Sequence, residues 1–296
     1  TPSMATCSGC GRGLGDGFLS CPACGGTAIP ARVERGLQPL FEAGRVVAGR
    51  FRIEKVLGAG ASGVVYGVAD ELRKDHAALK VLWEQAGTEG TSLERLRREI
   101  RASQRAPHPN LVAVRDLLLV EGRPALLMER VEGETLRERV RREGPLSWGE
   151  AVVLAQDLLS ALSHLHGMSI VHRDVKSGNI LLGPRGAVKL GDFGLAKGED
   201  LGMSLTVTGV SLGTPGYMAP EVIRGKEATP ASDLYSAGAV LYEMLAGRLP
   251  FQGASSLEVA SRQIRDPPPL GPLRDRKVPR WLVRFTSRLI EPDPAD

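Results

Sequence analysis

Residues 51–66 read Phe-Arg-Ile-Glu-Lys-Val-Leu-Gly-Ala-Gly-Ala-Ser-Gly-Val-Val-Tyr, which is a strand-like run, a glycine-rich turn and the start of a second strand-like run. Dinucleotide-binding folds also carry this glycine spacing, but there a helix follows the glycines and an acidic residue ends the second parallel strand. Neither feature is present here. Val64-Val-Tyr66 continues as a strand, and the next strand-like run, residues 77–82, presents Lys80. Two strands joined by a glycine turn predict a flap that covers phosphate groups.

Further motifs follow in a fixed order along the chain. They are His172-Arg-Asp-Val-Lys-Ser-Gly-Asn179, Asp192-Phe-Gly194, Gly213-Thr-Pro-Gly-Tyr217 and Ala219-Pro-Glu221. With the glycine turn and Lys80, they resemble the motifs of the protein kinase family, in the style of bacterial Hanks-type serine/threonine kinases. The resemblance extends from about Val46 to the end of the chain. It implies an α+β fold with two lobes. A twisted antiparallel sheet and helix αC would form the small upper lobe, the larger lower lobe would be mainly α-helical, and ATP would bind between them.

The resemblance gives the residues around the catalytic loop their expected chemistry. Phosphoryl transfer depends mainly on positioning and on charge neutralisation. Asp174 would orient the substrate hydroxyl and accept its proton, and Lys176 would counter the charge of the transferring phosphoryl group. Asn179 and Asp192 would hold Mg²⁺ or Mn²⁺ through oxygen atoms. A lysine two residues after Asp174 is typical of serine/threonine kinases, and Thr214 would contact the catalytic loop beside the protein substrate.

The upper lobe and the hinge would bind the nucleotide. Lys80 would grip the α- and β-phosphates, and Glu99 would pair with it from helix αC, which we expect to begin at Thr91. Met128 would be the gatekeeper. The residues that the resemblance places around ATP are Leu57, Gly58, Gly60, Gly63, Val65, Ala78, Lys80, Met128, Glu129, Val131 and Leu181. The glycines would let backbone amides approach the phosphates without intervening side chains.

All four cysteines lie in a short N-terminal segment, as Cys7-x-x-Cys10 and Cys21-x-x-Cys24. Each pair can point two sulfurs at one ion, and two pairs complete the tetrahedral sulfur shell that Zn²⁺ favours. Because so short a segment buries little apolar surface, the metal would supply its folding free energy. Iron is the minor alternative, and a pair of disulfides would require an oxidising compartment. The segment resembles a zinc ribbon, which we expect to recruit a protein partner or to modulate the kinase.

Two hydroxyls predict regulation by phosphorylation. Thr206 and Thr208 precede Thr214 at the spacing at which bacterial kinases of this family autophosphorylate. A phosphate there would add a charge of about −2, which Arg173 and the arginines of helix αC could bind. Autophosphorylation would bring two copies into contact, so a transient homodimer belongs to the same interpretation. The alternative is that both threonines are ordinary loop hydroxyls.

Composition and charge exclude several classes of protein. Hydrophobic residues make up 42% and charged residues 24% of the 296 residues, and the formal net charge is +4. These values are typical of a globular protein and do not favour nucleic acid as a partner. No uncharged apolar segment reaches the roughly 18 residues of a membrane span. Without a signal peptide, we expect a cytoplasmic protein, and a membrane anchor beyond Asp296 stays an open alternative. His164 and His166 are interpreted as packing or surface residues.

The chain is expected to have three regions. These are a four-cysteine metal-binding module at 1–28, a linker at 29–45 with a short amphipathic element, and a kinase domain at 46–296. The kinase domain would divide into an upper lobe with hinge (46–131) and a lower lobe (132–296), in which Asp233 opens the anchoring helix αF. The chain starts at Thr1 and ends before the arginine that the family pairs with Glu221. We therefore expect a fragment with an incomplete lower lobe; the alternative is that this buried ion pair is missing.

Two other functions remain open beside an active kinase. The first is a pseudokinase or scaffold, which would have lost Lys80, Asp174 or Asp192, and all three are present. The second is a zinc-dependent binding protein in which the kinase domain is secondary. Deleting residues 1–28 and measuring both activity and partner capture would separate this second reading from an active kinase.

Overall fold

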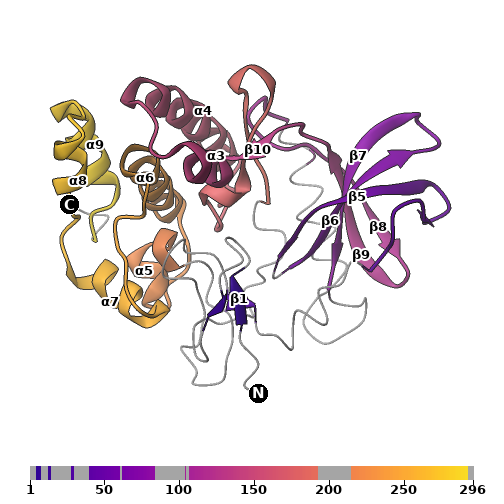
Figure 1. Ribbon diagram of the computed structural model, residues 1–296, viewed down its shortest axis with the longest axis horizontal. Coiled ribbons are helices and arrows are strands. Elements are labelled where there is room, and N and C mark those ends of the chain that lie inside the picture. The colour runs from indigo at the N-terminus through magenta and orange to yellow at the C-terminus, as the bar shows by residue number, and fades with distance from the viewer. Residues whose placement is uncertain are drawn as a thin grey trace. The chain divides into compact units, whose positions relative to one another are not determined.

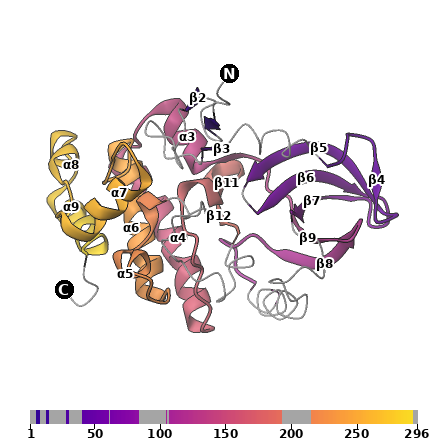
Figure 2. The same cartoon turned by 90° about the horizontal axis from the view of Figure 1, so that it is seen from below.

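The structure is a computed structural model that describes residues 40–60, 62–83, 104, 107–192 and 215–292, together with three short strands near the N-terminus. The described residues belong to two compact units, a sheet-rich unit within residues 32–132 and a helix-rich unit that comprises most of the chain from Gly133 onward. Figure 1 and Figure 2 label the elements of each unit.

The sheet-rich unit is built on six antiparallel strands in the order β4-β5-β6-β7-β9-β8. The strands are β4 (Val46–Val47), β5 (Phe51–Gly60), β6 (Gly63–Asp70), β7 (Asp75–Leu82), β8 (Val114–Val120) and β9 (Arg123–Glu129). The glycine turn joins β5 to β6, since Gly60 pairs with Gly63. The predicted succession of strand, glycine turn and strand is therefore confirmed, and so is the antiparallel sheet.

One face of this sheet carries the core of the unit. Alternate residues of β5 and β6, such as Phe51, Ile53, Val64 and Tyr66, are buried together with apolar residues of β7 and β9. The core also includes Phe41, which precedes β4 and is 3% exposed. The backbone N–H of Phe41 donates to the hydroxyl of Tyr66 at 3.3 Å, and the two ring centroids lie 5.7 Å apart. Part of the segment expected to be a linker thus packs as an integral piece of the sheet-rich unit.

A partly buried ion pair closes the turn between β6 and β7. Both carboxylate oxygens of Asp70 accept from the Arg50 guanidinium, at 2.7 and 2.6 Å, and one of them also accepts the backbone N–H groups of Leu72 and Arg73. The Arg50 guanidinium, assisted by the two backbone donors, lowers the pKa of Asp70 to about 2 against the effect of burial. Asp70 therefore stays ionised at neutral pH and fixes the turn.

The helix-rich unit is centred on α6 (Pro230–Ala246), which is buried along most of its length and packs against α4 (Trp148–Gly167) and α9 (Arg280–Leu289). The other helices are α3 (Leu136–Glu143), α5 (Pro220–Ile223), α7 (Ser256–Arg265) and α8 (Gly271–Asp275). In the described part of this unit there are also three short 3₁₀ turns: η1 (Ser177–Asn179), η2 (Pro184–Gly186) and η3 (Pro215–Tyr217). The mainly helical composition expected for the lower lobe is confirmed.

A small antiparallel sheet joins the segments that follow the predicted catalytic loop to a short strand that precedes α3. It has the order β10-β11-β12, from Glu134–Thr135, Ile180–Leu182 and Val188–Leu190. β11 begins directly after Asn179, and β12 ends two residues before Asp192. Because Ile180 pairs with Leu190, the hairpin brings the backbone positions of these two predicted metal ligands to the same end of the sheet.

Helix ends in this unit follow ordinary capping chemistry. Thr135 caps α3, its hydroxyl accepts the backbone N–H of Glu138 at 3.2 Å, and the Glu138 carboxylate accepts the N–H of Thr135 at 2.8 Å. Thr229 caps α6 in the same way with Ser232. The Ser232 hydroxyl also donates to Glu221 at 2.6 Å. Within the described ranges no cation pairs with Glu221, so a serine hydroxyl is the donor to this carboxylate.

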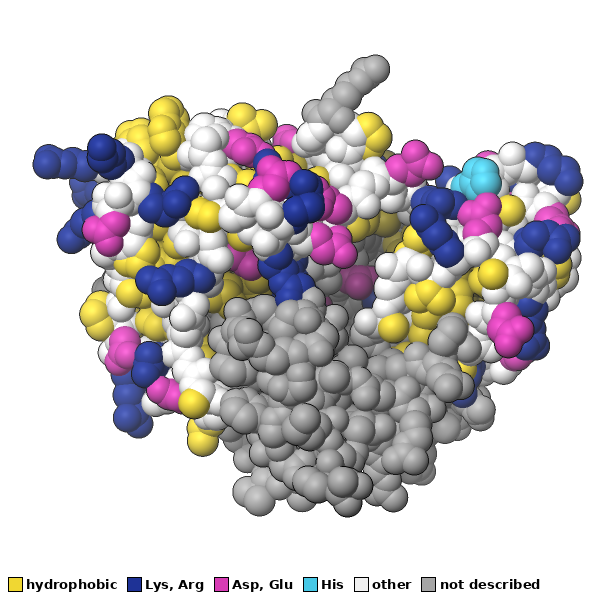
Figure 3. Space-filling model, viewed as in Figure 1, with side chains coloured by type: hydrophobic (Ala, Val, Ile, Leu, Met, Phe, Trp, Pro, Cys, Tyr) yellow, Lys and Arg dark blue, Asp and Glu magenta, His cyan; other side chains and the backbone are white. Residues whose placement is uncertain are grey.

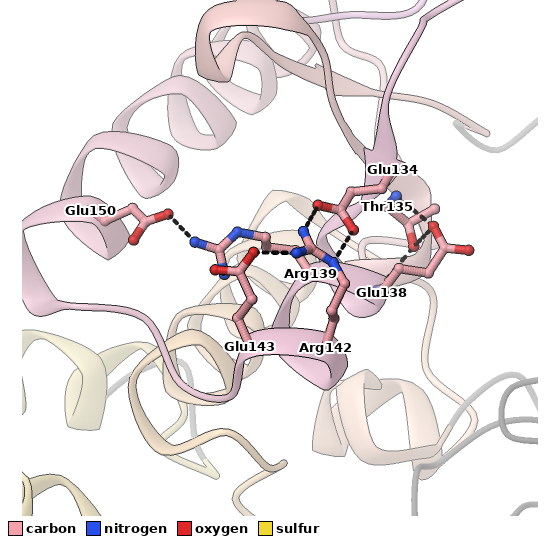
Figure 4. Close-up of polar contacts among 7 residues, drawn as sticks. All are labelled: Glu134, Thr135, Glu138, Arg139, Arg142, Glu143 and Glu150. Atoms are coloured by element: carbon pink, nitrogen blue, oxygen red, sulfur yellow. Dashed lines mark hydrogen bonds and ion pairs between the residues drawn. The ribbon is translucent and has the colours of Figure 1, made fainter.

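Two of the four arginines of α3, Arg139 and Arg142, are held by neighbouring carboxylates (Figure 4). Arg139 pairs with Glu143 at 2.5 Å and with Glu150 at 3.2 Å, and Arg142 pairs with Glu134 and Glu143, each at 2.5 Å. On the face of the molecule seen in Figure 3, basic and acidic side chains are interspersed. Such a surface has no large field of one sign, and Arg139 and Arg142 of α3 are accordingly ion-paired surface residues.

Some of the predicted residues lie outside the described part of the chain. These are helix αC with Thr91 and Glu99, the activation-segment residues Thr206, Thr208 and Thr214, and the side chains of Cys7, Cys10, Cys21 and Cys24. Near the N-terminus, β1 (Ala5–Cys7) pairs antiparallel with β2 (Gly13–Leu14) and β3 (Ala28–Ile29). Among the helices that the structure describes, none has the length and apolar character needed to cross a lipid bilayer.

Candidate active site

Two predicted catalytic side chains and one predicted magnesium ligand meet in the loop before β11. The Lys176 ammonium lies 2.7 Å from Oδ2 of Asp174. The Asn179 amide nitrogen donates to the same oxygen at 2.9 Å and to the backbone carbonyl of Asp174 at 2.8 Å. The turn η1 makes this meeting possible, because the N–H of Asn179 donates to the carbonyl of Lys176 at 2.9 Å and folds the loop back on itself. The carboxylate of Asp174 therefore receives two donors from its own loop.

Asp233 at the start of α6 holds the backbone of this loop. Its carboxylate accepts the backbone N–H of His172 at 2.7 Å and that of Arg173 at 2.9 Å. A third donor is the ring of His166, whose Nε2 lies 2.9 Å from the same carboxylate. Asp233 is 1% exposed, and a buried carboxylate is stable only when such donors surround it. The three bonds fix where the loop leaves α4 and where Asp174 stands.

His172 links the loop to the segment that carries Asp192. Burial lowers the pKa of the fully buried His172 ring, while the carboxylates of Asp233, Asp174 and Asp192 oppose this effect. In the neutral ring, Nδ1 accepts the backbone N–H of Asp174 at 3.2 Å, and Nε2 therefore carries the proton and donates to the carbonyl of Gly191 at 3.2 Å. One imidazole thus bridges the backbone of Asp174 and that of Gly191, the residue before Asp192.

Two residues of this site adopt left-handed backbone conformations. Arg173 has φ of 66° and Asp192 has φ of 57°, a region that non-glycine residues enter only at an energetic cost. Both are flanked by hydrogen bonds that enforce the conformation: Arg173 by Asp233, and Asp192 by the bond from Gly191 N–H to the carbonyl of Asn179 at 2.9 Å. Strain that is held by its surroundings in this way is commonly found at functional sites.

The donor set of Asn179 and Asp192 fits a hard divalent cation. The amide nitrogen of Asn179 donates to Asp174. The amide oxygen is therefore the acceptor that Asn179 can offer to a cation. An amide oxygen and a carboxylate are ligands that Mg²⁺ accepts, with water and phosphate oxygens completing its shell. Within the described part of the chain, no cluster of three or more His, Cys, Asp and Glu residues could hold a metal by itself. A cation at these two residues would accordingly need oxygen ligands from another molecule.

In the sheet-rich unit, Lys80 stands in the middle of β7 between two neighbouring strands. It lies opposite Val65 of β6 and Leu126 of β9, and it is 7% exposed. Ala78, one alternation earlier on the same face of β7, lies opposite Gly67 and Met128. The predicted nucleotide-binding residues Val65, Ala78 and Lys80 are therefore neighbours on adjacent strands, since side chains alternate along a strand with a period of two.

The three glycines of the turn differ in what their surroundings require. A Cβ built on Gly63 would overlap the carbonyl of Val81 on the neighbouring strand, so the sheet itself requires glycine there. Apart from its chain neighbours, a Cβ on Gly58 or Gly60 would meet no atom of the described residues within 4 Å, and neither residue has a positive φ. The fold by itself therefore does not explain glycine at these two positions. The indole of Trp83 donates to the carbonyl of Gly60 at 2.7 Å and ties down the end of β5.

The end of β9 forms the predicted hinge. Met128 is buried, at 7% exposure, between Ala78 and Val114. The backbone N–H of Glu129 donates to the carbonyl of Ala113 at 2.9 Å, and its carboxylate accepts the N–H of Ala113 at 3.2 Å. Val131 follows in a segment without regular structure, and Leu57 on β5 is 42% exposed. Leu181 belongs to the other unit, on β11 opposite Thr135 and Lys189.

Sequence reasoning missed two polar contacts of this site. His166, interpreted as a packing or surface residue, donates to Asp233, and the hydroxyl of Ser177 inside the catalytic loop bonds Tyr217 at 2.8 Å. The partners lie 67 and 40 positions apart in the sequence, and no local pattern marks them. For His166, a usable signal was its position on α4, six residues before His172 at the entrance to the catalytic loop.

Comparison with known proteins decides the family. The protein kinase domain model matches residues 51–296. The chain belongs to the protein kinase family. The relatives it resembles include PknA of Mycobacterium tuberculosis (strain H37Rv), a serine/threonine-protein kinase that is 40% identical over 231 residues, covering 76% of this chain and 53% of PknA. PrkC of Bacillus subtilis (strain 168) is 34% identical over 251 residues, covering 85% of this chain and 39% of PrkC.

This kinase family chain is also similar to a solved structure. The crystal structure of Rad53 residues 1–466 in complex with AMP-PNP matches with a TM-score of 0.71 and 27% identity, covering 85% of this chain and 63% of that one. The curated relatives are bacterial serine/threonine-protein kinases, so the predicted resemblance to bacterial Hanks-type kinases is confirmed. The chain spans about half or less of the length of these curated relatives.

Proposed function

We propose that this chain transfers the γ-phosphoryl group of MgATP to serine or threonine hydroxyls of protein substrates. The observation that supports this most directly is the convergence of Lys176 and Asn179 on one carboxylate oxygen of Asp174, at 2.7 and 2.9 Å. A carboxylate held by a cation and an amide is suited to orient a hydroxyl and to receive its proton. Membership of the protein kinase family and serine/threonine-kinase relatives support the same reaction.

Each group in the proposed reaction has one task. The substrate oxygen forms a bond to the γ-phosphorus, the bond from that phosphorus to the β–γ bridging oxygen breaks, and ADP leaves. Asp174 orients the hydroxyl and takes its proton, and Lys176 offsets negative charge on the transferring group. Asn179 and Asp192 supply oxygen ligands for Mg²⁺ or Mn²⁺, which would neutralise phosphate charge when bound. Thr214 would contact the protein substrate.

The nucleotide would be held by the sheet-rich unit and the hinge. Lys80, paired with Glu99, would bind the α- and β-phosphates, and the backbone of Glu129 and Val131 would meet adenine. Gly58 and Gly60 support this proposal, because their surroundings within the fold do not require glycine, whereas close approach of phosphates to the backbone would. The remaining residues proposed to line the nucleotide are Leu57, Gly63, Val65, Ala78, Met128 and Leu181.

The test is transfer of labelled γ-phosphate from MgATP to a serine- or threonine-containing protein or peptide. We expect Asp174→Asn to lower the rate by about a thousandfold, the scale of losing a positioned base, while the melting temperature changes little. Asp275→Asn, on the exposed helix α8, is the matched control and should retain full activity. A wild-type protein that binds MgATP but transfers no phosphate to any substrate or to itself would overturn the proposal and favour a scaffold.

The N-terminal segment is proposed to be a separate module. Residues 1–28 would bind one Zn²⁺ through Cys7, Cys10, Cys21 and Cys24, with residues 29–45 connecting it to a kinase domain at 46–296. The paired Cys-x-x-Cys spacing supports this proposal. Elemental analysis of purified protein should give about one zinc per chain, and Cys7→Ser with Cys10→Ser should abolish it. Bound iron, or four cysteines without metal and without free thiol, would contradict the zinc assignment.

Activation by phosphorylation is a further part of the proposed function. Thr206 or Thr208 would be phosphorylated by a second copy of the chain in a transient homodimer, in a cytoplasmic protein. The phosphate would bind Arg173, which directly precedes Asp174 and is exposed. Peptide mapping after incubation with MgATP should locate the phosphate, and Thr206→Ala with Thr208→Ala should cut activity markedly. Undiminished turnover in that double variant would refute this part.

A further inference from the structure

Three buried side chains from distant segments form one hydrogen-bonded chain beside the catalytic loop. The hydroxyl of Ser177 in η1 lies 2.8 Å from the hydroxyl of Tyr217 in η3, and Tyr217 donates to Oε2 of Glu243 on α6 at 2.6 Å. Ser177 is 0%, Tyr217 4% and Glu243 9% exposed. The chain of bonds joins the catalytic loop, the segment just after Thr214 and the central helix of the helix-rich unit.

The charges around these side chains determine which of them donates. Burial raises the pKa of the Tyr217 phenol, and the adjacent Glu243 carboxylate raises it further, so the phenol keeps its proton and donates to Glu243. Burial raises the pKa of Glu243, whereas the bond from Tyr217 and the charges of Arg137 and Arg141 lower it. Since the Tyr217 proton is directed at Glu243, the Ser177 hydroxyl is the donor in its bond to Tyr217.

Ser177 is close in sequence to residues that bond Asp174, so a shift of its backbone would also shift the proposed reacting groups. It lies directly between Lys176, which bonds Asp174, and the Gly178-Asn179 pair, whose amide also bonds Asp174. On the side of α3, the Arg137 side chain lies beside Gly178, where a Cβ would stand 3.4 Å from its guanidinium carbon, an ordinary van der Waals distance. The side-chain bond that holds the turn from another segment is therefore the one from Ser177 to Tyr217.

We propose that Ser177 is a positioning residue for phosphoryl transfer: its bond to Tyr217 fixes the spacing of Lys176 and Asn179 around Asp174. This inference rests on the proposed kinase function and adds to it a residue that touches neither ATP nor the substrate hydroxyl. Small displacements of reacting groups cost large factors in rate, because productive geometry must be held within fractions of an ångström. Removing one hydroxyl should therefore slow the chemical step more than it weakens the fold.

The test compares Ser177→Ala, Tyr217→Phe and the double variant in steady-state transfer to a peptide substrate. We expect kcat to fall about tenfold in Ser177→Ala, and the KM for ATP to stay within about twofold of the wild-type value, since an interaction used in the transition state affects kcat selectively. The two single effects should be clearly less than additive in the double variant, because both substitutions interrupt the same chain of bonds.

The matched control is Thr286→Val, which also removes one fully buried hydroxyl from the helix-rich unit. That hydroxyl donates to the carbonyl of Leu282 within α9, away from the catalytic loop. It should lower the melting temperature as much as Ser177→Ala while leaving kcat unchanged. Additive single effects, a kcat of Ser177→Ala equal to that of the wild type, or an equal loss in Thr286→Val would each overturn the inference. If the wild-type protein itself shows no transfer activity, the proposed kinase function fails. If the wild type is active but the Ser177 variants behave otherwise than expected, only the positioning role of Ser177 fails.

Discussion

The carboxylate of Asp233 accepts a hydrogen bond of 2.7 Å from the backbone N–H of His172, across 61 positions of sequence. The next backbone N–H, from Arg173, donates to the other oxygen at 2.9 Å. The start of α6 thus holds the main chain of the proposed catalytic loop directly, and the position of Asp174 depends on a residue that is not one of the proposed catalytic groups.

Replacing Asp233 should disable the loop without removing any catalytic group. In Asp233→Asn, the amide offers one acceptor oxygen where the carboxylate offered two, and its nitrogen faces backbone donors. We expect a loss of about 2 kcal/mol in the free energy of unfolding, the scale of leaving a buried donor unsatisfied, and a large fall in kcat. Urea unfolding and phosphate transfer measure the two effects. A variant with wild-type kcat would show that the loop keeps its geometry without these bonds.

The two kinds of glycine in the flap should respond differently to alanine. Gly63→Ala should destabilise the protein by about 1–3 kcal/mol, the usual cost of overpacking, because its Cβ would overlap the carbonyl of Val81. Gly60→Ala should leave the melting temperature unchanged, because a methyl group there meets no atom of the described residues within 4 Å apart from its chain neighbours. It should raise the KM for ATP, because the methyl group would stand where the phosphates are proposed to approach the backbone. Thermal unfolding and ATP titration of both variants provide the comparison. An unchanged KM in Gly60→Ala would argue against close contact with phosphates.

Lys80 should be required for nucleotide use and not for folding. Lys80→Met keeps most of the apolar stem that packs between Val65 and Leu126 but removes the charge. We expect ATP affinity or turnover to fall by at least about a hundredfold, the scale of losing a preorganised charge at a phosphate. Lys55→Met on the exposed edge of β5 is the control and should behave as the wild type. If Lys80→Met and Lys55→Met lost equal activity, the loss would be due to the change in surface charge and not to a specific role of Lys80.

The ion pair of Arg50 and Asp70 should make stability depend on pH in the acid range. The pKa of Asp70 is about 2 in the folded protein, against an ordinary value of 3.8, so its contribution is complete above about pH 4 and disappears as the pH falls towards 2. Asp70→Asn should lower the free energy of unfolding by about 2 kcal/mol at pH 7, as expected for hydrogen bonds to a charged group. The difference from the wild type should shrink between pH 4 and pH 2. A difference that stays constant over this range would contradict the assignment.

The sequence by itself determined the family and the order of its parts. Strand, glycine turn and strand could be predicted from residues 51–66, because strand composition and turn chemistry are local properties. The motifs around Asp174 and Asp192 identified the family for a related reason: the chemistry constrains residue types at short spacings, as between Asp174, Lys176 and Asn179. These features need no knowledge of what lies across the fold.

Only the tertiary structure decided what holds those parts in place. Each of the supporting contacts joins residues that are 25 to 67 positions apart in the sequence. They are the contact of Phe41 with Tyr66, that of His166 with Asp233, and the chain of bonds from Ser177 through Tyr217 to Glu243. Burial and hydrogen-bond partners of this kind arise when distant segments pack, and a buried polar group is stable only with partners that its own neighbours in sequence do not supply. The residue types in the motifs were enough to predict the reacting groups. Only the packing of distant segments showed which hydrogen bonds hold those groups in place.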